Sequence, residues 1–298
     1  MASSDCASPP YIGKKATIAP QLSAALAARG WTPTQLVEPF IGMGGFSRTL
    51  GIPVIGNDAD PAISAFHNLR QFRSELLKMG CDDFFAKYVD ADGRVEPHTF
   101  AVHEAALQQF REKFINTPVS PAHLNDPASQ ASLLTGAICL LTKLQWSFRS
   151  AFWNHRSIDK TKKHSWSGGI TKTMGDLGYN FVWNLSWEDF LKSEIVQRAL
   201  RDSGTVVYMD PVYFGTNGYY YYSIKVKPFD HDALQATARA LSAANIKWMM
   251  SYNDCAPAWK LYGDQPWCTV RRVCYSRGPL VTSTRKVESE LLIMAVFQ

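Results

Sequence analysis

Asp210, Pro211, Val212 and Tyr213 form the segment of this chain whose residue types could do chemistry most directly. They follow the apolar run 205–209, which predicts a buried strand, and open α/β sheets place reactive groups beyond the ends of such strands. The Asp210 carboxylate and the Pro211 carbonyl could each accept a hydrogen bond from an amino group, and the Tyr213 ring could stack on a planar base. The segment therefore suits an adenine or cytosine amino group, although an ordinary Asp-Pro turn is the alternative.

A second group of residues lies near the start of the chain, where a glycine-rich turn separates two predicted strands, 35–40 and 54–58. The turn contains Gly42, Gly44 and Gly45. Such a turn lets backbone amides approach a ligand, and an acid that ends the next strand can bind both hydroxyls of a ribose. The spacing is neither GxGxxG nor GxxxxGK[ST], which disfavours a dinucleotide or a nucleoside triphosphate. A smaller cofactor with one adenosine and a short charged tail fits better.

Asp58 is the acid at the end of that second strand. The alternative is that the glycines only permit a tight turn and that Asp58 caps the helix opened by Pro61. Asp60 is the more natural cap of that helix, and this leaves Asp58 for a ligand.

The middle of the chain has a different character from its two ends. Apolar residues recur at helical spacing over 62–79, 98–115 and 127–144. Residues 147–179 then interleave basic and aromatic side chains, which favours contact with a nucleic acid over burial. An exposed, poorly ordered loop is the alternative. The candidate contacts in this stretch are Arg149, Asn154, Arg156, Lys160, Lys162, Lys163 and Lys172.

The remaining segments again predict alternating helices and strands, as at the start of the chain. A helix is expected over 18–29 and again over 188–201 and 230–244. Strands are expected over 181–185 and 247–251, with two late alternating runs near 268–275 and 290–297. We therefore expect both ends of the chain to form one α/β domain with a doubly wound sheet.

The composition is that of a soluble protein with a large core, since 46% of the 298 residues are hydrophobic. No apolar run approaches the roughly 20 residues of a membrane span, and the first residues lack the order of a secretion signal, so we expect a cytoplasmic protein with no membrane partner. The six cysteines have no metal-ligand spacing, so we expect reduced thiols and no metal. The net charge of +5 is compatible with a polyanionic partner.

Taken in order, these segments resemble the Dam-like adenine-N6 DNA methyltransferases of the D12 class. The resemblance covers about residues 10–68 and 180–298, and the middle third matches only in position. The matching segments are Tyr11 to Lys15, Glu38 to Gly45, Asn57-Asp58, Trp187 to Phe190, Asp210 to Tyr213, Ser251 to Asp254, Val270 to Arg272 and Lys286 to Leu292.

The resemblance implies a Rossmann-like, S-adenosylmethionine-dependent methyltransferase domain over 1–68 and 180–298. Residues 69–179 would be a mainly helical, basic insertion that recognises the target. The reaction would be methyl transfer to the adenine N6 of double-stranded DNA by base flipping, with Asp210, Pro211 and Tyr213 as catalytic residues. The implied cofactor contacts are Tyr11, Lys15, Phe40, Gly42, Gly44, Gly45, Asp58, Asp189 and Phe190.

The resemblance also has implications for the binding partners of the protein. Arg285 and Lys286, near the catalytic face, would add phosphate contacts, although an exposed polar hairpin is the alternative. The protein would be a monomer or a weak homodimer, and a cognate restriction enzyme stays open as a partner.

One residue departs from the family pattern. The family has proline where this chain has Val212, and valine lacks the fixed φ of proline, so the loop is less pre-organised. A non-catalytic nucleic-acid-binding pseudoenzyme is therefore one alternative. The same cofactor chemistry on RNA or a modified base is another, because the basic, aromatic stretch 147–179 favours a nucleic acid but not DNA over RNA.

Overall fold

The computed structural model describes residues 15–91, 95, 97–115, 117–146, 180–215, 228–276 and 287–297. Within this part of the chain, one six-stranded sheet has the order β2-β1-β3-β4-β6-β5. Neighbouring strands from β2 to β4 pair in parallel, and β6 pairs antiparallel with both β4 and β5. The strands are β1 (Gln35–Glu38), β2 (Val54–Gly56), β3 (Thr205–Met209), β4 (Trp248–Asn253), β5 (Cys268–Ser276) and β6 (Val287–Ala295).

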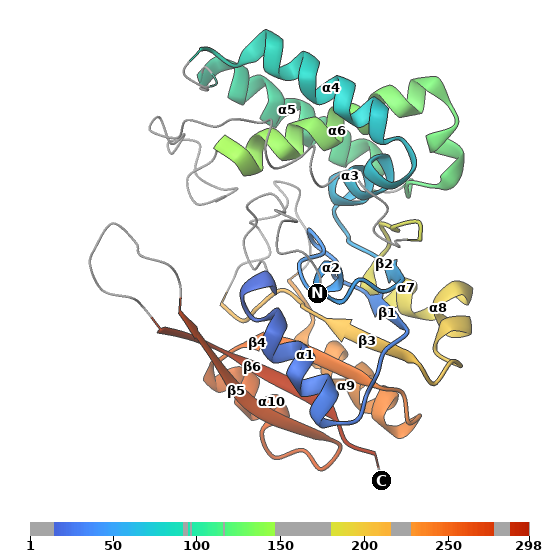
Figure 1. The fold of residues 1–298 in the computed structure, drawn as a ribbon, viewed down its shortest axis with the longest axis vertical. Helices are drawn as coiled ribbons and strands as arrows, with labels where there is room; N and C mark the ends of the chain where they lie inside the picture. Colours follow the sequence, from blue (N-terminus) through green and yellow to red (C-terminus); the bar gives the residue numbers. More distant parts are fainter. Residues whose placement is uncertain are drawn as a thin grey trace.

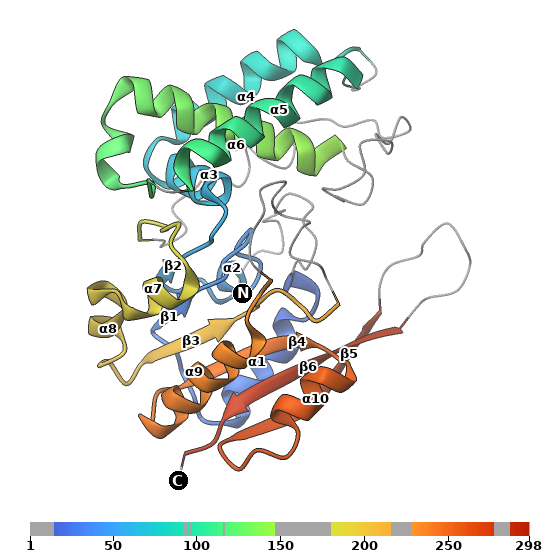
Figure 2. The ribbon, with the colours of Figure 1, turned by 180° about the vertical axis from the view of Figure 1, so that it is seen from behind.

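The central strands are apolar on both faces because helices cover both sides of the sheet. Every residue of β3 is buried, as are the first five residues of β4. Helix α1 (Ala19–Ala28) lies on the face seen in Figure 1, and α9 (His231–Ala243) and α10 (Ala256–Tyr262) lie on the opposite face, seen in Figure 2. The mixed α/β architecture with a mostly parallel sheet agrees with the expected fold class.

The helices of the middle third form a layer at one end of the molecule (Figure 1). Helix α3 (Pro61–Phe72) leads from the sheet into this layer, which contains α4 (Ser74–Tyr88), α5 (Pro97–Phe114) and α6 (Pro127–Trp146). The separate role of 69–179 in target recognition stays a prediction.

Asp60 joins this helical layer to the sheet. Its Oδ1 accepts the Ala62 N–H at 3.0 Å, which confirms Asp60 as the cap of α3. The same carboxylate pairs with the Arg111 guanidinium of α5, and both side chains are almost completely buried. A buried charge needs such a partner, so this ion pair fixes α5 against the start of α3.

The structure corrects several of the expected elements. The helix expected over 62–79 is two helices that meet at Arg73, where the backbone leaves helical geometry (φ −144°, ψ 45°). The helix expected over 188–201 is likewise divided into α7 (Trp187–Lys192) and α8 (Glu194–Ala199). Helix α10 was not expected. Residues 181–185 are not a strand, because only Trp183 forms a bridge, with Asn57.

Helix α3 satisfies part of the backbone of that irregular segment. Asn68 donates to the Val182 carbonyl at 2.8 Å and accepts from the Val182 N–H at 2.8 Å. Ser64 adds a second bond to the same carbonyl at 2.6 Å. These side chains satisfy the backbone of Val182, while Trp183 pairs with the end of β2, donating to the Gly56 carbonyl and accepting from the Asp58 N–H, both at 3.0 Å. A search of the described helices for one long and apolar enough to cross a membrane found none.

Candidate functional site

The end of β3 positions Asp210 on the same side of the sheet as the glycine-rich turn. Side chains alternate along a strand, so Tyr208 and Asp210 point to one face. The Tyr208 ring packs on Phe46, which follows the turn, with ring centroids 4.7 Å apart. Because β1 and β3 pair in parallel, Glu38 at the end of β1 lies beside this stretch of β3.

Lys15 connects Asp210, at the end of β3, to Glu290 on β6. Its Nζ lies 3.1 Å from Asp210 Oδ1 and 3.0 Å from Glu290 Oε2, and the lysine is buried. It also donates to the Tyr213 hydroxyl. The resemblance implied that Lys15 contacts the amino-acid end of the cofactor; in this structure its partners are carboxylates of the protein itself.

The Lys15 ammonium and the nearby carboxylates shift each other's pKa values. Burial alone would lower the pKa of Lys15, but the charges of Asp210 and Glu290 outweigh it, and the pKa is raised. Burial raises the pKa of Asp210 to about 6, and the nearby Lys15 opposes that rise. Lys15 is therefore charged at neutral pH, and Asp210 is mostly ionised.

Glu290 is a residue of this cluster that the sequence reasoning assigned no role. It lies on β6 and accepts hydrogen bonds from Lys15, from the Tyr213 hydroxyl at 2.8 Å and from the Tyr275 hydroxyl at 3.0 Å. The signal that could have identified it is an acid directly before the apolar run Leu291 to Ala295 in an expected strand, since a buried carboxylate must be paired.

The Tyr213 ring is held from two sides. Its hydroxyl is tied to Glu290, and one face packs against the ring of Tyr252, with centroids 5.7 Å apart and planes inclined by 19°. A flipped base would therefore have to stack on the opposite face of Tyr213.

The glycine-rich turn has the geometry that glycine permits. Gly42 and Gly44 have φ of 49° and 66°, a region that side chains disfavour. Asp58 accepts the Gly42 N–H at 3.0 Å and the Asp60 N–H at 2.9 Å. Burial raises the pKa of Asp58 to about 7. His67, which the sequence reasoning did not single out, holds the Gly42 carbonyl through Nε2 at 2.7 Å. Asp58 thus lies against the turn, where a ribose-binding acid was expected.

Glu38 and Arg48 flank the same turn, and both carry polar atoms that have no hydrogen-bond partner among the described residues. Glu38 is 2% exposed, and its Oε1 accepts no hydrogen bond; burial raises its pKa to about 8. All three guanidinium nitrogens of Arg48, on α2 (Ser47–Leu50), are inaccessible and have no hydrogen-bond partner in the described part of the chain. Unpaired buried polar atoms are costly, so these groups are suited to a ligand that carries both an amine and a carboxylate.

Three aromatic rings lie together beyond the turn. Phe40, Trp187 and Phe229 have pairwise centroid distances of 5.7 to 6.3 Å. Asp189 is exposed at the start of α7 and accepts from the Ser186 hydroxyl at 2.8 Å. The Phe190 ring is 0% exposed and packs into the core, so its side chain offers no ligand surface in this structure.

A comparison with known protein families gives a match that includes the Asp210 part of this site. Residues 186–273 match the D12 class N6 adenine-specific DNA methyltransferase family. The matched segment contains α7, the strand β3 with Asp210 to Tyr213, and β4. The resemblance to this family is thereby confirmed. No curated protein matches the chain.

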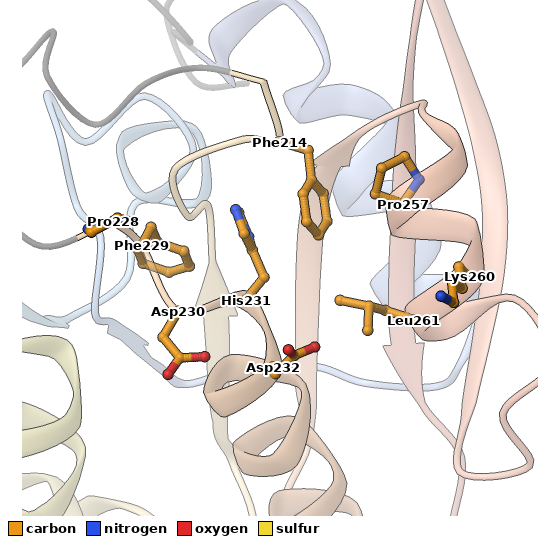
Figure 3. Close-up of a pocket in the computed structure, with 9 residues that line it drawn as sticks. All are labelled: Phe214, Pro228, Phe229, Asp230, His231, Asp232, Pro257, Lys260 and Leu261. Atoms are coloured by element: carbon orange, nitrogen blue, oxygen red, sulfur yellow. The ribbon is translucent and has the colours of Figure 1, made fainter.

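A family of this kind methylates adenine in DNA, and methyltransferases of this kind generally use S-adenosylmethionine. A hollow of about 550 Å³ lies next to Phe214, between the start of α9 and helix α10. Figure 3 shows His231 between the rings of Phe214 and Phe229, with Pro257 and Lys260 on the α10 side. The residues that line it do not include Asp210, so it is distinct from the cluster around Lys15.

Several predicted contacts lie outside the described residues, and their roles stay predictions. These are Tyr11, Arg149, Asn154, Arg156, Lys160, Lys162, Lys163, Lys172, Arg285 and Lys286.

Proposed function

We propose that this protein transfers a methyl group from S-adenosylmethionine to the N6 amino group of adenine in double-stranded DNA, after the base has been flipped from the duplex. The observation that carries the proposal is the placement of Asp210 and Tyr213 at the end of β3, beside a turn flanked by Glu38 and Arg48. A carboxylate and an aromatic ring are the groups needed to hold a flipped amino-bearing base.

The residues around the turn fit the cofactor. Glu38 would accept the ammonium of its amino-acid end and Arg48 would bind the carboxylate, which satisfies both unpaired groups. Asp58 would bind the ribose, and the rings of Phe40, Trp187 and Phe229 would contact the adenine. The bound cofactor supplies an electrophilic methyl group on a positively charged sulfur.

The charge of the site suits that positive sulfur. Asp210 and Glu290 share the single positive charge of Lys15, which leaves a net negative charge on this cluster when both acids are ionised. Electrostatic attraction across a buried site is stronger than in water. The cluster would therefore favour the cationic form of the cofactor over its neutral product.

Asp210 and Pro211 would orient the amino nitrogen of the base. Hydrogen bonds from its two N–H groups to the Asp210 carboxylate and the Pro211 carbonyl favour a tetrahedral nitrogen whose lone pair is free to attack. Tyr213 would stack on the base with the face that does not touch Tyr252. The nitrogen must then lose one proton, and the raised pKa of Asp210 makes that carboxylate a suitable acceptor.

DNA binding would depend on the basic residues of 149–172 and on Arg285 and Lys286. Contacts from such side chains to phosphates make affinity fall as salt rises. These residues thus remain the proposed DNA contacts.

The proposal is tested by offering the protein labelled S-adenosylmethionine with duplex DNA, single-stranded DNA and RNA, followed by digestion to nucleosides. Label in N6-methyladenine from duplex DNA is the expected result. Label from RNA alone would support the alternative acceptor. Cofactor binding without any transfer would support the pseudoenzyme.

A matched pair of variants completes this experiment. Asp210→Asn should abolish transfer, while Asp82→Asn should leave it unchanged. Asp82 is a suitable control because it lies in an exposed ion pair with Lys78 on α4, far along the chain from the turn.

A further inference from the structure

We propose that Asn253 is a positioning residue that holds the catalytic loop in place of the second proline that this chain lacks at position 212. The inference rests on the proposed function, because it concerns how Asp210, Pro211 and Tyr213 are held for the same reaction. Such a role for Asn253 would explain how the segment from Asp210 to Phe214 keeps one backbone conformation although position 212 is valine.

The central observation is a pair of hydrogen bonds between one side chain and one backbone residue. Asn253 Oδ1 accepts the Phe214 N–H at 3.1 Å, and Asn253 Nδ2 donates to the Phe214 carbonyl at 3.0 Å. Phe214 directly follows Tyr213. The amide of Asn253 therefore fixes the backbone at the end of the catalytic segment in both directions, as a neighbouring strand would.

Asn253 can do this because its own position is fixed by the sheet. It is the last residue of β4 and lies opposite Glu290 of β6 in the antiparallel register. Glu290 in turn holds Lys15 and Tyr213. The end of β4 and the adjacent part of β6 thus hold two consecutive loop residues, Tyr213 by its side chain and Phe214 by its backbone.

Ring packing restrains the same residues. Tyr252 packs against Tyr213 and lies 5.3 Å from the Phe214 ring, centroid to centroid. The Phe214 ring also stacks on His231 at the start of α9, with centroids 3.7 Å apart, as Figure 3 shows. His231 is hydrogen-bonded to the Tyr252 hydroxyl. The loop is therefore clamped between β4 and α9.

Asn253 and a proline at position 212 would have the same physical effect, because each reduces the conformational freedom of the loop. Proline at 212 would restrict the loop by fixing its own φ, whereas Asn253 restricts it by binding the backbone two residues later. Within the described residues the Val212 N–H has no hydrogen-bond partner, so proline there would remove no bond to this part of the chain. The two devices act on the same short segment, and each should matter less when the other is present.

A double-mutant cycle tests this redundancy. Methyl transfer is measured for the wild type, Asn253→Ala, Val212→Pro and the double variant. Asn253→Ala should reduce kcat by about 10-fold or more with little change in the KM for the cofactor, because loop geometry is lost while the cofactor residues stay in place. In the Val212→Pro background the same substitution should cost under about 3-fold. An equal loss in both backgrounds would overturn the proposal.

Amide hydrogen exchange provides a readout that needs no reaction. Asn253→Ala should accelerate exchange of the Phe214 amide, because its acceptor is removed, and Asn253→Asp should accelerate it less, because an acceptor oxygen remains. Unchanged exchange at Phe214 would overturn the clamp even if Val212→Pro fails to fold. Faster exchange in a protein that methylates nothing would leave the clamp standing and contradict the proposed function alone.

Asn184→Ala is the matched control. Asn184 is buried and forms the same kind of paired contact, accepting from the Val119 N–H at 2.7 Å and donating to the Phe114 carbonyl at 3.4 Å. Its loss should lower stability without selectively accelerating exchange at Phe214 or interacting with Val212→Pro. A coupling of Asn184→Ala with Val212→Pro as large as that of Asn253→Ala would show that general destabilisation explains the result, and would overturn the proposal.

Discussion

Lys15 Nζ lies 3.1 Å from Asp210 Oδ1, so an ammonium of the protein contacts the carboxylate to which the proposed function assigns the amino group of the target base. Glu290, 3.0 Å from the same nitrogen, is a second carboxylate that can retain the ammonium while Asp210 binds the base. The cluster is thus arranged to share one cation between two acids.

Removing that cation should change the pH dependence of methyl transfer. In Lys15→Met, Asp210 and Glu290 would be neighbouring buried carboxylates without a counter-charge, so the pKa of Asp210 should rise above its value of about 6. Because Asp210 must be ionised to accept the amino group, the acid limb of the pH–rate profile should move to higher pH by about one unit or more. Lys15→Arg, which keeps the charge, should shift it little. An unchanged acid limb in Lys15→Met would contradict this role.

Glu38 should make stability fall as the pH rises. Its pKa is about 8 in the folded protein, above the value of about 4.3 expected in the unfolded chain. The folded state therefore holds a proton more tightly, and that contribution to stability is present below about pH 4 and lost as the pH rises through about 8. The melting temperature of Glu38→Gln relative to the wild type should increase between pH 5 and pH 9. A constant difference would show that Glu38 does not titrate in this range.

Arg48 should contribute to cofactor affinity and reduce the stability of the free protein. Its guanidinium nitrogens are inaccessible and have no partner among the residues that the structure describes, which is costly, so Arg48→Met should raise the melting temperature without ligand. The same variant should bind S-adenosylhomocysteine about 10-fold more weakly or worse, because a charged hydrogen bond is lost. Binding of 5′-methylthioadenosine, which lacks the amino-acid tail, should be unchanged in calorimetry. Equal losses for both ligands would contradict a carboxylate-binding role.

The buried ion pair between Asp60 and Arg111 should be a large determinant of stability. Arg111→Met would leave the Asp60 carboxylate buried without its cation, at a cost of about 3–5 kcal/mol in the free energy of unfolding by urea. Arg198→Met is the control, because its pair with Glu194 is exposed, and it should cost less than about 1 kcal/mol. Similar costs for the two variants would show that burial does not govern this pair.

Much of the sheet could be predicted because its strands are short apolar runs bounded by turn residues. Thr205 to Met209 is buried along its whole length, and Pro61 opens α3 after the Asp60 cap, as the sequence indicated. Local patterns of this kind depend on residues adjacent in the chain.

The division of the predicted helices could not be predicted from local sequence patterns. Apolar residues continue at helical spacing across Arg73, and the break there accompanies contacts with residues far along the chain. The Arg73 side chain donates to the Leu124 carbonyl at 3.1 Å and to Asn125 at 2.7 Å. Such tertiary contacts override the local period.

Prediction of the candidate site was limited in the same way, because local patterns do not show which distant residues meet. Asp210 and Tyr213 could be identified because they stand together in one short segment. Lys15, Glu290 and Tyr275 meet them only through the fold, since Lys15 and Glu290 are 275 positions apart in the chain. The clamp of Asn253 on Phe214 spans 39 positions and likewise needed the strand register.

The most direct test of the central claim is the single-turnover rate of N6-methyladenine formation in duplex DNA by the wild type and by Asp210→Asn, with the cofactor dissociation constant measured for both. We predict a rate lower by about 100-fold or more in Asp210→Asn, with cofactor affinity within about 3-fold of the wild type, because the oxygen lost orients the amino group and does not bind the cofactor. An unchanged rate in Asp210→Asn, or a wild-type product other than N6-methyladenine, would contradict the account.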